Sequence, residues 1–479
     1  MKLFLNKYKY LLLTFLISFI LFYPSLFGFY TNDDFYHLKI SHATSVHEFI
    51  NFFNLVEGSS GQLLYRPLTT HVFYFLGWGL FNLNPIGLHI VSFVLLFIVI
   101  YCVYKLAFLI SENEKIAVIS AFLYAVSATH FGHLYYLATE IVLGAVFFST
   151  VIFFTKYIKS KSRGYLILSI FFFALSLLAK ENSVVLPAVF VLLYAYFQIT
   201  KKTKIKVTKF LLSLIPFAII LIIYMYFHFF YYGFVSGDSY LWNLSPIKAL
   251  NTILWYGLWS FNLPEMLVDF IGPGLNVNPD LLKYWGDQII PILVLFVTQL
   301  CILFYAIFKS RILSRKYESL FCIGWFLITL SPILFLPLHK FTFYLTLPLF
   351  GVVLLLSYLF EKCKSFVLVL FCVVWTATSL LTLNLTRQTN WITQGEAIAR
   401  RVYDYVNVNK TSLEDKTVVF YDTEEDNKLP FSPTETVKNT LSDNNFFEVF
   451  YDGKIKAIYD SSSAQKDSSM IRSRMFIGY

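Results

Sequence analysis

The sequence predicts an all-α membrane protein with about 11 transmembrane helices and a small α/β unit at its C-terminus. Of its 479 residues, 57% are hydrophobic and only 14% are charged, far from the average of soluble proteins. The apolar residues fall in blocks of about twenty, the length that a helix needs to cross a bilayer. Short clusters of Lys and Arg separate these blocks. From Arg387 onward the composition becomes polar, which predicts a separate tail.

The first apolar block is predicted to be a retained transmembrane span rather than a signal peptide. Three lysines precede an apolar run of about twenty residues that begins at Tyr10. The sequence Tyr23-Pro24-Ser25 at its end is a poor cleavage site, because such sites need small residues. The N-terminus is therefore expected in the cytoplasm.

Residues 67–84 decide the number of spans. About sixteen residues of helix reach only about 24 Å, less than the bilayer core of about 30 Å. If this segment lies in the interface, every later cluster of Lys and Arg falls on the same side as the N-terminal lysines, as the positive-inside rule requires. We therefore predict an interfacial helix here. The predicted spans are then residues 10–29, 86–108, 116–132, 137–155, 164–180, 183–199, 210–230, 288–308, 318–336, 341–360 and 366–385.

This topology divides the chain into two predicted domains. Residues 1–385 form the transmembrane domain, with long outer segments at residues 30–85 and 231–287. Residues 386–479, here called the tail, form an extracytoplasmic domain. Residues 251–259 suggest a further interfacial helix. In the tail the residue pattern predicts an amphipathic helix, a strand and a hairpin, at residues 391–406, 417–421, and 446–451 with 454–459.

The formal net charge of +9 does not indicate a nucleic-acid partner. The Lys and Arg residues lie in short clusters between apolar blocks, where they report topology. The predicted location is thus an integral position in the membrane, with the plasma (inner) membrane expected and the C-terminus outside.

Two adjacent carboxylates, Asp33 and Asp34, directly follow the first span. Such residues often cap a helix and complement its dipole. However, Arg66 opens the next apolar segment on the same predicted side. A carboxylate and an arginine can together deprotonate a hydroxyl and neutralise a phosphate leaving group. His37 lies one helical turn beyond Asp33 and would face the same way.

Three predicted hairpins turn on the outer side, and each tip carries polar or charged residues. Turns are often polar, which explains some of them. Lys180 and Glu181 have apolar neighbours on both sides, so they should face a protein interior or a wet cavity. They can serve either as functional groups or as a structural ion pair. The tip residues are His130, His133 and Glu140, then Lys180 and Glu181, then His339 and Lys340.

The order of several short motifs resembles a known family. In order they are the Asp-Asp pair, Tyr65-Arg66-Pro67-Leu68-Thr69, Asn84-Pro85-Ile86-Gly87-Leu88-His89, His130-x-x-His133, Ala179-Lys180-Glu181-Asn182 and Tyr344-x-x-Leu347-Pro348. Residues 10–385 resemble the membrane part of the transmembrane O-mannosyltransferases that carry tetratricopeptide repeats. More broadly they are similar to the C-type glycosyltransferase superfamily, which includes protein O-mannosyltransferases and lipid A aminoarabinose transferases.

The resemblance implies an inverting transfer of a sugar from a polyprenyl monophosphate to an acceptor hydroxyl on the outer face of the membrane. By that pattern Asp33 is the catalytic base and Asp34 its acidic neighbour. Arg66 contacts the donor phosphate. His339, Lys340 and Lys180 are further phosphate-binding candidates, and His37, Glu140, Glu181, His130 and His133 are other site candidates.

The expected partners are the polyprenyl-phosphate sugar, the membrane, and a lipid, glycan or protein acceptor. The tail has no helical repeats, so a protein acceptor has no support from the sequence. No cofactor is expected to be required. Asp33, Asp34 and Glu140 carry the oxygen ligands that a divalent ion prefers, but cations of the chain can neutralise a monophosphate, so we expect no metal.

Two other functions fit a polytopic protein. A transporter or lipid flippase would place charges near mid-span and often shows repeated halves. Here the charges cluster at predicted outer ends, and no repeat is visible. A glycan ligase or polymerase with a diphosphate-linked donor would need outer cations but not the early Asp-Asp pair.

Overall fold

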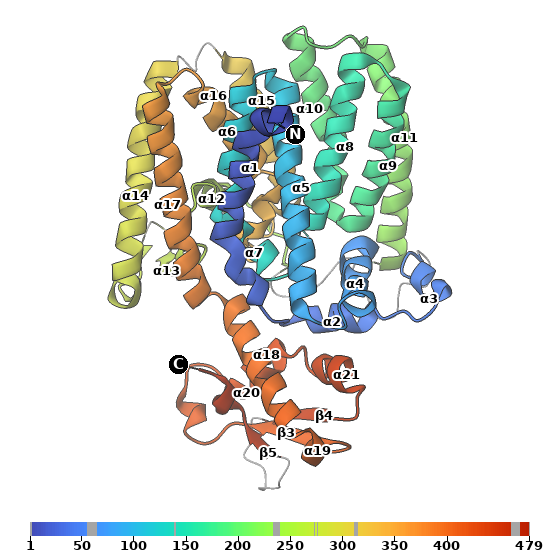
Figure 1. The fold of residues 1–479 in the computed structure, drawn as a ribbon, viewed down its shortest axis with the longest axis vertical. Helices are drawn as coiled ribbons and strands as arrows, with labels where there is room; N and C mark the ends of the chain where they lie inside the picture. Colours follow the sequence, from blue (N-terminus) through green and yellow to red (C-terminus); the bar gives the residue numbers. More distant parts are fainter. Residues whose placement is uncertain are drawn as a thin grey trace.

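The computed structural model describes residues 2–54, 65–137, 140–232, 240–272, 274, 276–310, 315–460 and 470–478. Long helices form a bundle, and the tail lies at one end of it (Figure 1). Among the described residues, seven helices are long and apolar enough to cross a membrane, or eight if a pair bent by 50° is one span. These features confirm an all-α polytopic membrane protein, while the number of eleven spans stays a prediction.

Each of the eleven predicted spans contains helix. Besides the bent pair, α9, α15 and α16 have fewer than eighteen residues, which is why a criterion of length and composition gives a lower number. α10 meets the criterion only together with the 3-10 helix before it, over Glu181–Ile199. The helices are α1 (Lys2–Phe22), α5 (Pro85–Ser111), α6 (Glu114–Ala125) with α7 (Phe131–Leu134), α8 (Glu140–Ser160), α9 (Arg163–Ala179), α10 (Leu186–Ile199), α11 (Val207–Phe227), α14 (Asp280–Ser310), α15 (Lys316–Leu330), α16 (Leu349–Phe360) and α17 (Ser365–Thr389).

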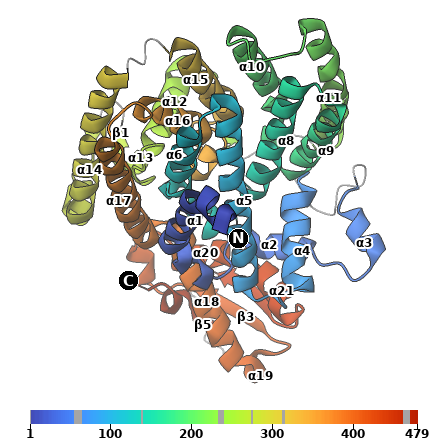
Figure 2. The same cartoon turned by 45° about the horizontal axis from the view of Figure 1, so that its top comes forward.

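Shorter elements follow the first span and lie at the tail end of the bundle (Figures 1 and 2). They are α2 (Asp33–Ile40), α3 (Val46–Asn51), the π-helix η2 (Pro67–Val72) and α4 (Phe73–Gly79). The last two form the predicted interfacial segment. The second outer segment contains α12 (Pro246–Trp259), α13 (Leu267–Phe270) and the short strands β1 (Ile271–Gly272) and β2 (Asn276–Val277), with residues 233–239 outside the described part.

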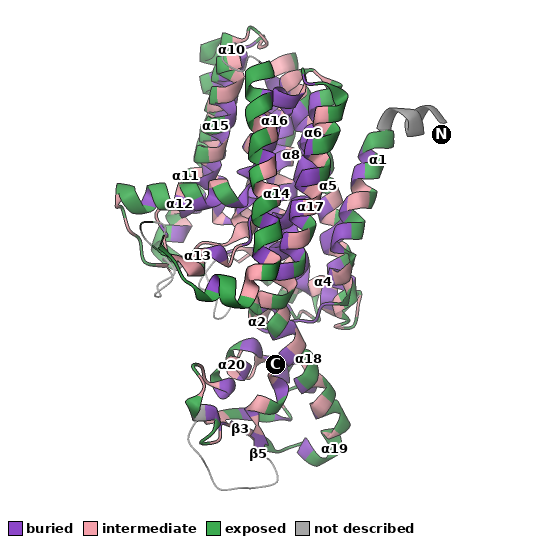
Figure 3. Ribbon diagram, turned by 90° about the vertical axis from the view of Figure 1, so that its left-hand side faces the viewer, coloured by how far each residue is buried: buried purple, intermediate pink, exposed green. Residues whose placement is uncertain are grey.

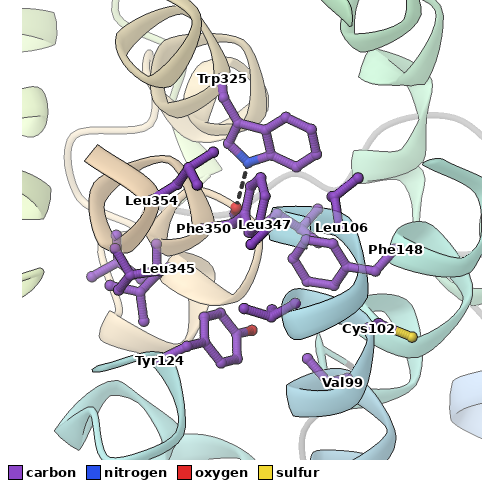
Figure 4. Close-up of a cluster of buried hydrophobic side chains, with 14 of the residues drawn as sticks. Val99, Cys102, Leu106, Tyr124, Phe148, Trp325, Leu345, Leu347, Phe350 and Leu354 are labelled. Atoms are coloured by element: carbon purple, nitrogen blue, oxygen red, sulfur yellow. Dashed lines mark hydrogen bonds between the residues drawn. The ribbon is translucent and has the colours of Figure 1, made fainter. Parts of the chain in front are cut away.

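Aromatic side chains fill the centre of the bundle. In its most apolar stretch α8 is 67% buried, whereas α11 and α14 are 22% buried and turn their apolar faces outward (Figure 3). The rings of Phe148 and Trp325 stack with centroids 6.2 Å apart. The indole Nε1 of Trp325 donates to the carbonyl of Leu347 at 2.8 Å (Figure 4). This packing fixes α8, α15 and α16, whose ends lead to the predicted hairpin tips.

The basic clusters meet at the end of the bundle away from the tail (Figure 1). Lys159 and Lys202 both pair with Glu112. Arg315 pairs with Glu361 at 2.6 Å. These contacts join loops that the positive-inside rule places on one side. Which side of a membrane this end faces stays a prediction.

The tail contains a parallel sheet with helices around it. Its strands β3 (Thr417–Tyr421), β4 (Lys456–Asp460) and β5 (Met470–Arg472) have the order β4-β3-β5, and both pairings are parallel. The helices are α18 (Trp391–Val408), α19 (Lys410–Leu413), α20 (Pro433–Thr440) and α21 (Asn445–Tyr451). The predicted amphipathic helix and first strand are confirmed. The chain division at residue 385 stays a prediction, and α17 continues to Thr389.

The predicted hairpin at residues 446–459 is wrong. Residues 445–451 form α21, because their large apolar side chains recur with the spacing of one helix face and are buried. Asp452 (φ 51°) and Gly453 (φ 67°) end this helix instead of forming a hairpin turn. β4 then pairs with β3 rather than with residues 446–451.

Candidate active site

The two adjacent carboxylates are the last two residues of a tight turn over residues 31–34. The backbone N–H of Asp34 donates to the carbonyl of Thr31 at 3.1 Å, and the N–H of Thr31 donates to Oδ2 of Asp34 at 3.0 Å. Asn32, in the second position, has φ 51°. The turn leads into α2 with Asp34 buried and Asp33 exposed. The neighbouring acids therefore have different environments.

Asp34 is held inside the protein. The hydroxyl of Tyr74 on α4 donates to its Oδ1 at 2.6 Å. Burial raises the pKa of Asp34 to about 7, although the donors Tyr74 and Thr31 act to lower it, and the charge of Asp33 adds to the rise. Asp34 thus binds α2 to the preceding turn and to α4.

Asp33 faces outward, where the hydroxyl of Tyr136 donates to its Oδ2 at 3.1 Å. The charges of Asp33 and Arg66 both act on His37. Burial lowers the pKa of His37 to about 4, the charge of Asp33 opposes this shift, and the charge of Arg66 adds to it. The imidazole is therefore neutral at pH 7.

Arg66 binds Glu181 with a two-pronged contact. Its Nε lies 2.8 Å from Oε2 and its Nη2 lies 2.5 Å from Oε1. The local fold brings the two together, because the hydroxyl of Thr69 in η2 donates to the carbonyl of Ala179 at 2.8 Å, at the end of α9. The Arg66 motif and the Lys180-Glu181 tip, which we predicted to be on one side, are thus in direct contact.

Lys180 and Glu140 form a buried ion pair between the end of α9 and the start of α8. The Nζ of Lys180 also lies 4.7 Å from the ring centroid of Tyr344. The hydroxyl of Tyr344 is 2.7 Å from Nε2 of His339. Lys180 and Glu181 therefore both form ion pairs with residues of other segments. The three predicted hairpin tips meet at Tyr344.

A cavity of about 260 Å³ opens beside Arg66. Its lining combines polar side chains with a mostly apolar or aromatic wall. The charged and other polar residues are Arg66, Glu181, Asn182, His228 and His339, and the wall is formed by Val184, Tyr224, Met225, Tyr240, Trp242, Pro332, Ile333, Leu336 and Tyr344. Asp33 does not line it. Burial raises the pKa of Tyr240, and the negative charge of Asp33 is among the charges that add to this rise.

Of the predicted site residues, Arg66, Glu181 and His339 line the cavity. Three others have partners elsewhere in the protein. Nε2 of His130 is 2.7 Å from the carbonyl of Tyr124, and Nε2 of His133 is 2.7 Å from the hydroxyl of Thr346. Both imidazoles are buried and connect helices. The Nζ of Lys340 donates to Asn251 of α12 at 3.2 Å. The structure thus brings Arg66, Lys180, Glu181, Glu140 and His339 together, while His130, His133 and Lys340 have other partners.

No group of three or more His, Cys, Asp or Glu within the described ranges is arranged to hold a metal ion. The expectation that no metal is required stays a prediction.

Four tyrosines of this site were not among the predicted site residues. Tyr74 binds Asp34, Tyr136 binds Asp33, and Tyr240 and Tyr344 line the cavity. Tyr344 opens the motif that ends at Pro348. Tyr136 lies at a predicted hairpin tip between His133 and Glu140. This position in the sequence could have identified it as a site residue.

Comparison with known families supports the resemblance that the motifs indicated. Residues 66–227 match the model of a family described as dolichyl-phosphate-mannose-protein mannosyltransferase. The matched segment begins at Arg66 and includes Glu140 and the Lys180-Glu181 tip, whereas Asp33 and Asp34 precede it. Over these residues the chain is similar to that mannosyltransferase family. No curated protein matches the chain.

Proposed function

We propose that this protein is a membrane glycosyltransferase that transfers a sugar from a polyprenyl monophosphate to an acceptor hydroxyl at the outer face of the membrane, with inversion at the anomeric carbon. The observation that carries the proposal is the cavity beside Arg66. It combines one arginine fork with a largely apolar wall. A lipid phosphate needs both, because its headgroup is anionic and its chain is apolar.

Arg66 is suited to the donor phosphate. A guanidinium binds two oxygens of a carboxylate or phosphate through parallel N–H donors. Glu181 occupies this fork in the present arrangement. A donor phosphate would share or replace that carboxylate, with Lys180 and His339 nearby. The apolar residues of the wall, such as Met225 and Leu336, would contact the first prenyl units.

Asp33 is suited to the role of base. It is exposed, and the hydroxyl of Tyr136 restrains its carboxylate. In the proposed step Asp33 takes the proton of the acceptor hydroxyl, and the acceptor oxygen bonds to the anomeric carbon. The bond from that carbon to the phosphate oxygen breaks, and the prenyl phosphate leaves with the electron pair. Arg66 stabilises the charge that develops on the phosphate.

The positions of the charges do not favour a transporter. Glu140 begins α8 and Lys180 follows the last residue of α9, so this buried pair lies at helix ends and not at mid-span.

The test is release of prenyl phosphate from a panel of prenyl-phosphate sugars by the purified protein. Asp33→Asn should lower turnover at least about a hundredfold, because the amide cannot accept the proton. Asp404→Asn on the exposed face of α18 is the matched control and should keep wild-type turnover. Near-normal turnover of Asp33→Asn would reject Asp33 as the base, and no release from any donor would reject the proposed reaction.

A further inference from the structure

The turn that carries Asp33 is held by the tail. The N–H of Asn32 donates to the carbonyl of Thr440 at 2.7 Å, and its Nδ2 donates to the carbonyl of Asn439 at 3.3 Å. Asn439 and Thr440 are the last residues of α20. The turn and its partners are about four hundred residues apart in the chain, so only the folded tail can supply these acceptors.

A second tail helix touches the same turn. Gly395 on α18 lies so close that a Cβ at this position would be 2.3 Å from Oγ1 of Thr31 and 3.2 Å from Oδ1 of Asn32. The Thr31 hydroxyl in turn donates to Oδ1 of Asn32 at 2.7 Å. The absence of a side chain at Gly395 is therefore a condition for this arrangement.

The backbone of Asn32 is in a conformation that needs such support. Its φ of 51° and ψ of −122° lie in a region that glycine adopts easily and that side-chain-bearing residues rarely adopt. Residues hold such angles only where their surroundings determine them. Here those surroundings are α18 and α20 of the tail.

The helix after the turn is also anchored on the tail. Lys39 pairs with Glu448 of α21 at 2.6 Å. The rings of Phe35 and Phe446 meet edge to face with centroids 5.3 Å apart. Both ends of α2 are therefore fixed to the tail, at the turn and at its last residues.

We propose that Asn32 is a positioning residue, and that the tail holds the Thr31–Asp34 turn so that Asp33 faces Tyr136 while Asp34 stays buried. The tail is then part of the assembled active site. This inference rests on the proposed function, because it assigns to the tail the orientation of the proposed base.

Substitution of Asn32 tests the backbone requirement in the full-length protein. Asn32→Ala should lower kcat roughly tenfold or more, because alanine disfavours positive φ and small misplacements of a reacting group are costly. The KM for the donor should stay the same, because Arg66 and not the turn contacts the phosphate. Asn32→Gly should keep kcat within about threefold of wild type, because glycine adopts this conformation. Wild-type kcat in Asn32→Ala would overturn the proposal, and so would equal losses in both variants.

Substitution of Gly395 tests the contact from the tail side. Gly395→Ala should lower kcat to a similar extent with unchanged donor KM, because its methyl group would displace Thr31. Gly286→Ala in α14 is the matched control, since no atom lies within 4 Å of a Cβ there. If Gly395→Ala keeps the kcat of Gly286→Ala, the tail does not position the turn.

Amide hydrogen exchange separates this inference from the proposed function. Exchange over residues 33–40 should rise in Asn32→Ala and Gly395→Ala but not in Gly286→Ala. If wild-type protein transfers no sugar while exchange rises as expected, the proposed function fails and the structural contact stands. Unchanged exchange in both variants would overturn the proposal that the tail holds the Thr31–Asp34 turn, regardless of activity.

Discussion

At the scale of residues, neighbouring groups of the same type have different roles because their surroundings differ. Asp33 is exposed, whereas Asp34 is buried and its pKa is raised to about 7. Such a separation of two carboxyl groups is a common way to divide work in an active site. The two basic residues Lys180 and Arg66 also differ in their surroundings. Lys180 pairs with buried Glu140, whereas Arg66 lines the cavity with Glu181.

The two-pronged geometry of Arg66 predicts that a positive charge alone is not sufficient to bind the donor phosphate. Arg66→Lys keeps a positive charge but loses the fork, so the donor KM should rise about tenfold with a smaller change in kcat. Initial rates over a range of donor concentrations measure this. Lys340→Ala is the control, because Lys340 contacts Asn251 and does not line the cavity. A donor KM unchanged in Arg66→Lys would remove the bidentate contact from the mechanism.

At the scale of elements, short helices at the tail end connect the long ones to the site. η2 is tied to α9 through Thr69, and α2 is tied to α4 through Asp34 and Tyr74. Both are buried hydrogen bonds between segments far apart in sequence, and Nε1 of Trp78 on α4 also donates to the carbonyl of Leu38 on α2 at 2.8 Å. The site geometry therefore depends on a few polar contacts inside a mostly apolar bundle.

The contact between α2 and α4 predicts a pH dependence of stability. The pKa of Asp34 is about 7 in the folded protein against 3.8 as the ordinary value, so between these values the folded state binds the additional proton. Stability should therefore fall as pH rises from about 4 to about 7, by at most about 1.4 kcal/mol per pH unit. Thermal unfolding in detergent at several pH values measures this fall.

The matched variants are Asp34→Asn and Asp404→Asn. Asp34→Asn cannot ionise, so its unfolding midpoint should change less between pH 5 and pH 7.5 than that of the wild type. Asp404→Asn should retain the wild-type dependence. An identical pH dependence in wild type and Asp34→Asn would mean that Asp34 does not titrate in this range.

At the scale of the whole molecule, the two ends of the bundle have different chemistry. One end joins its basic loops through ion pairs such as Arg315 with Glu361. The other carries α4 and the tail (Figure 1). Arg66 lies directly before η2, the element that precedes α4, and lines the cavity. In the proposed reaction the donor reaches its site from the membrane, and the acceptor approaches from the side of the tail. The two ends should therefore face different compartments.

This polarity predicts the outcome of a reporter assay. A reporter that is active only outside the cytoplasm should be active when fused after Tyr479. The same reporter inserted between α8 and α9, at Lys161, should be inactive, because that loop is basic and lies at the other end. Activity at both positions, or at Lys161 alone, would contradict the predicted orientation.

Much of the fold follows from local pattern. A candidate span is located by the length of its own apolar block, because the thickness of the bilayer core is fixed. Its location therefore requires no knowledge of the segments that it contacts. Helix α18 and strand β3 were found because their residue periodicity is local. The hairpin prediction failed because turn residues such as Asp452 and Gly453 suit both a hairpin and a helix end.

The sequence by itself determined the membrane class, the positions of the helical segments and the set of charged residues at one predicted face. Only the tertiary structure decided which aspartate is exposed, that Arg66 binds Glu181, and that the tail touches Asn32. The physical reason is distance along the chain. Hydrophobic periodicity is a property of neighbouring residues, whereas these contacts join segments that only packing brings together, in one case through a backbone conformation with positive φ.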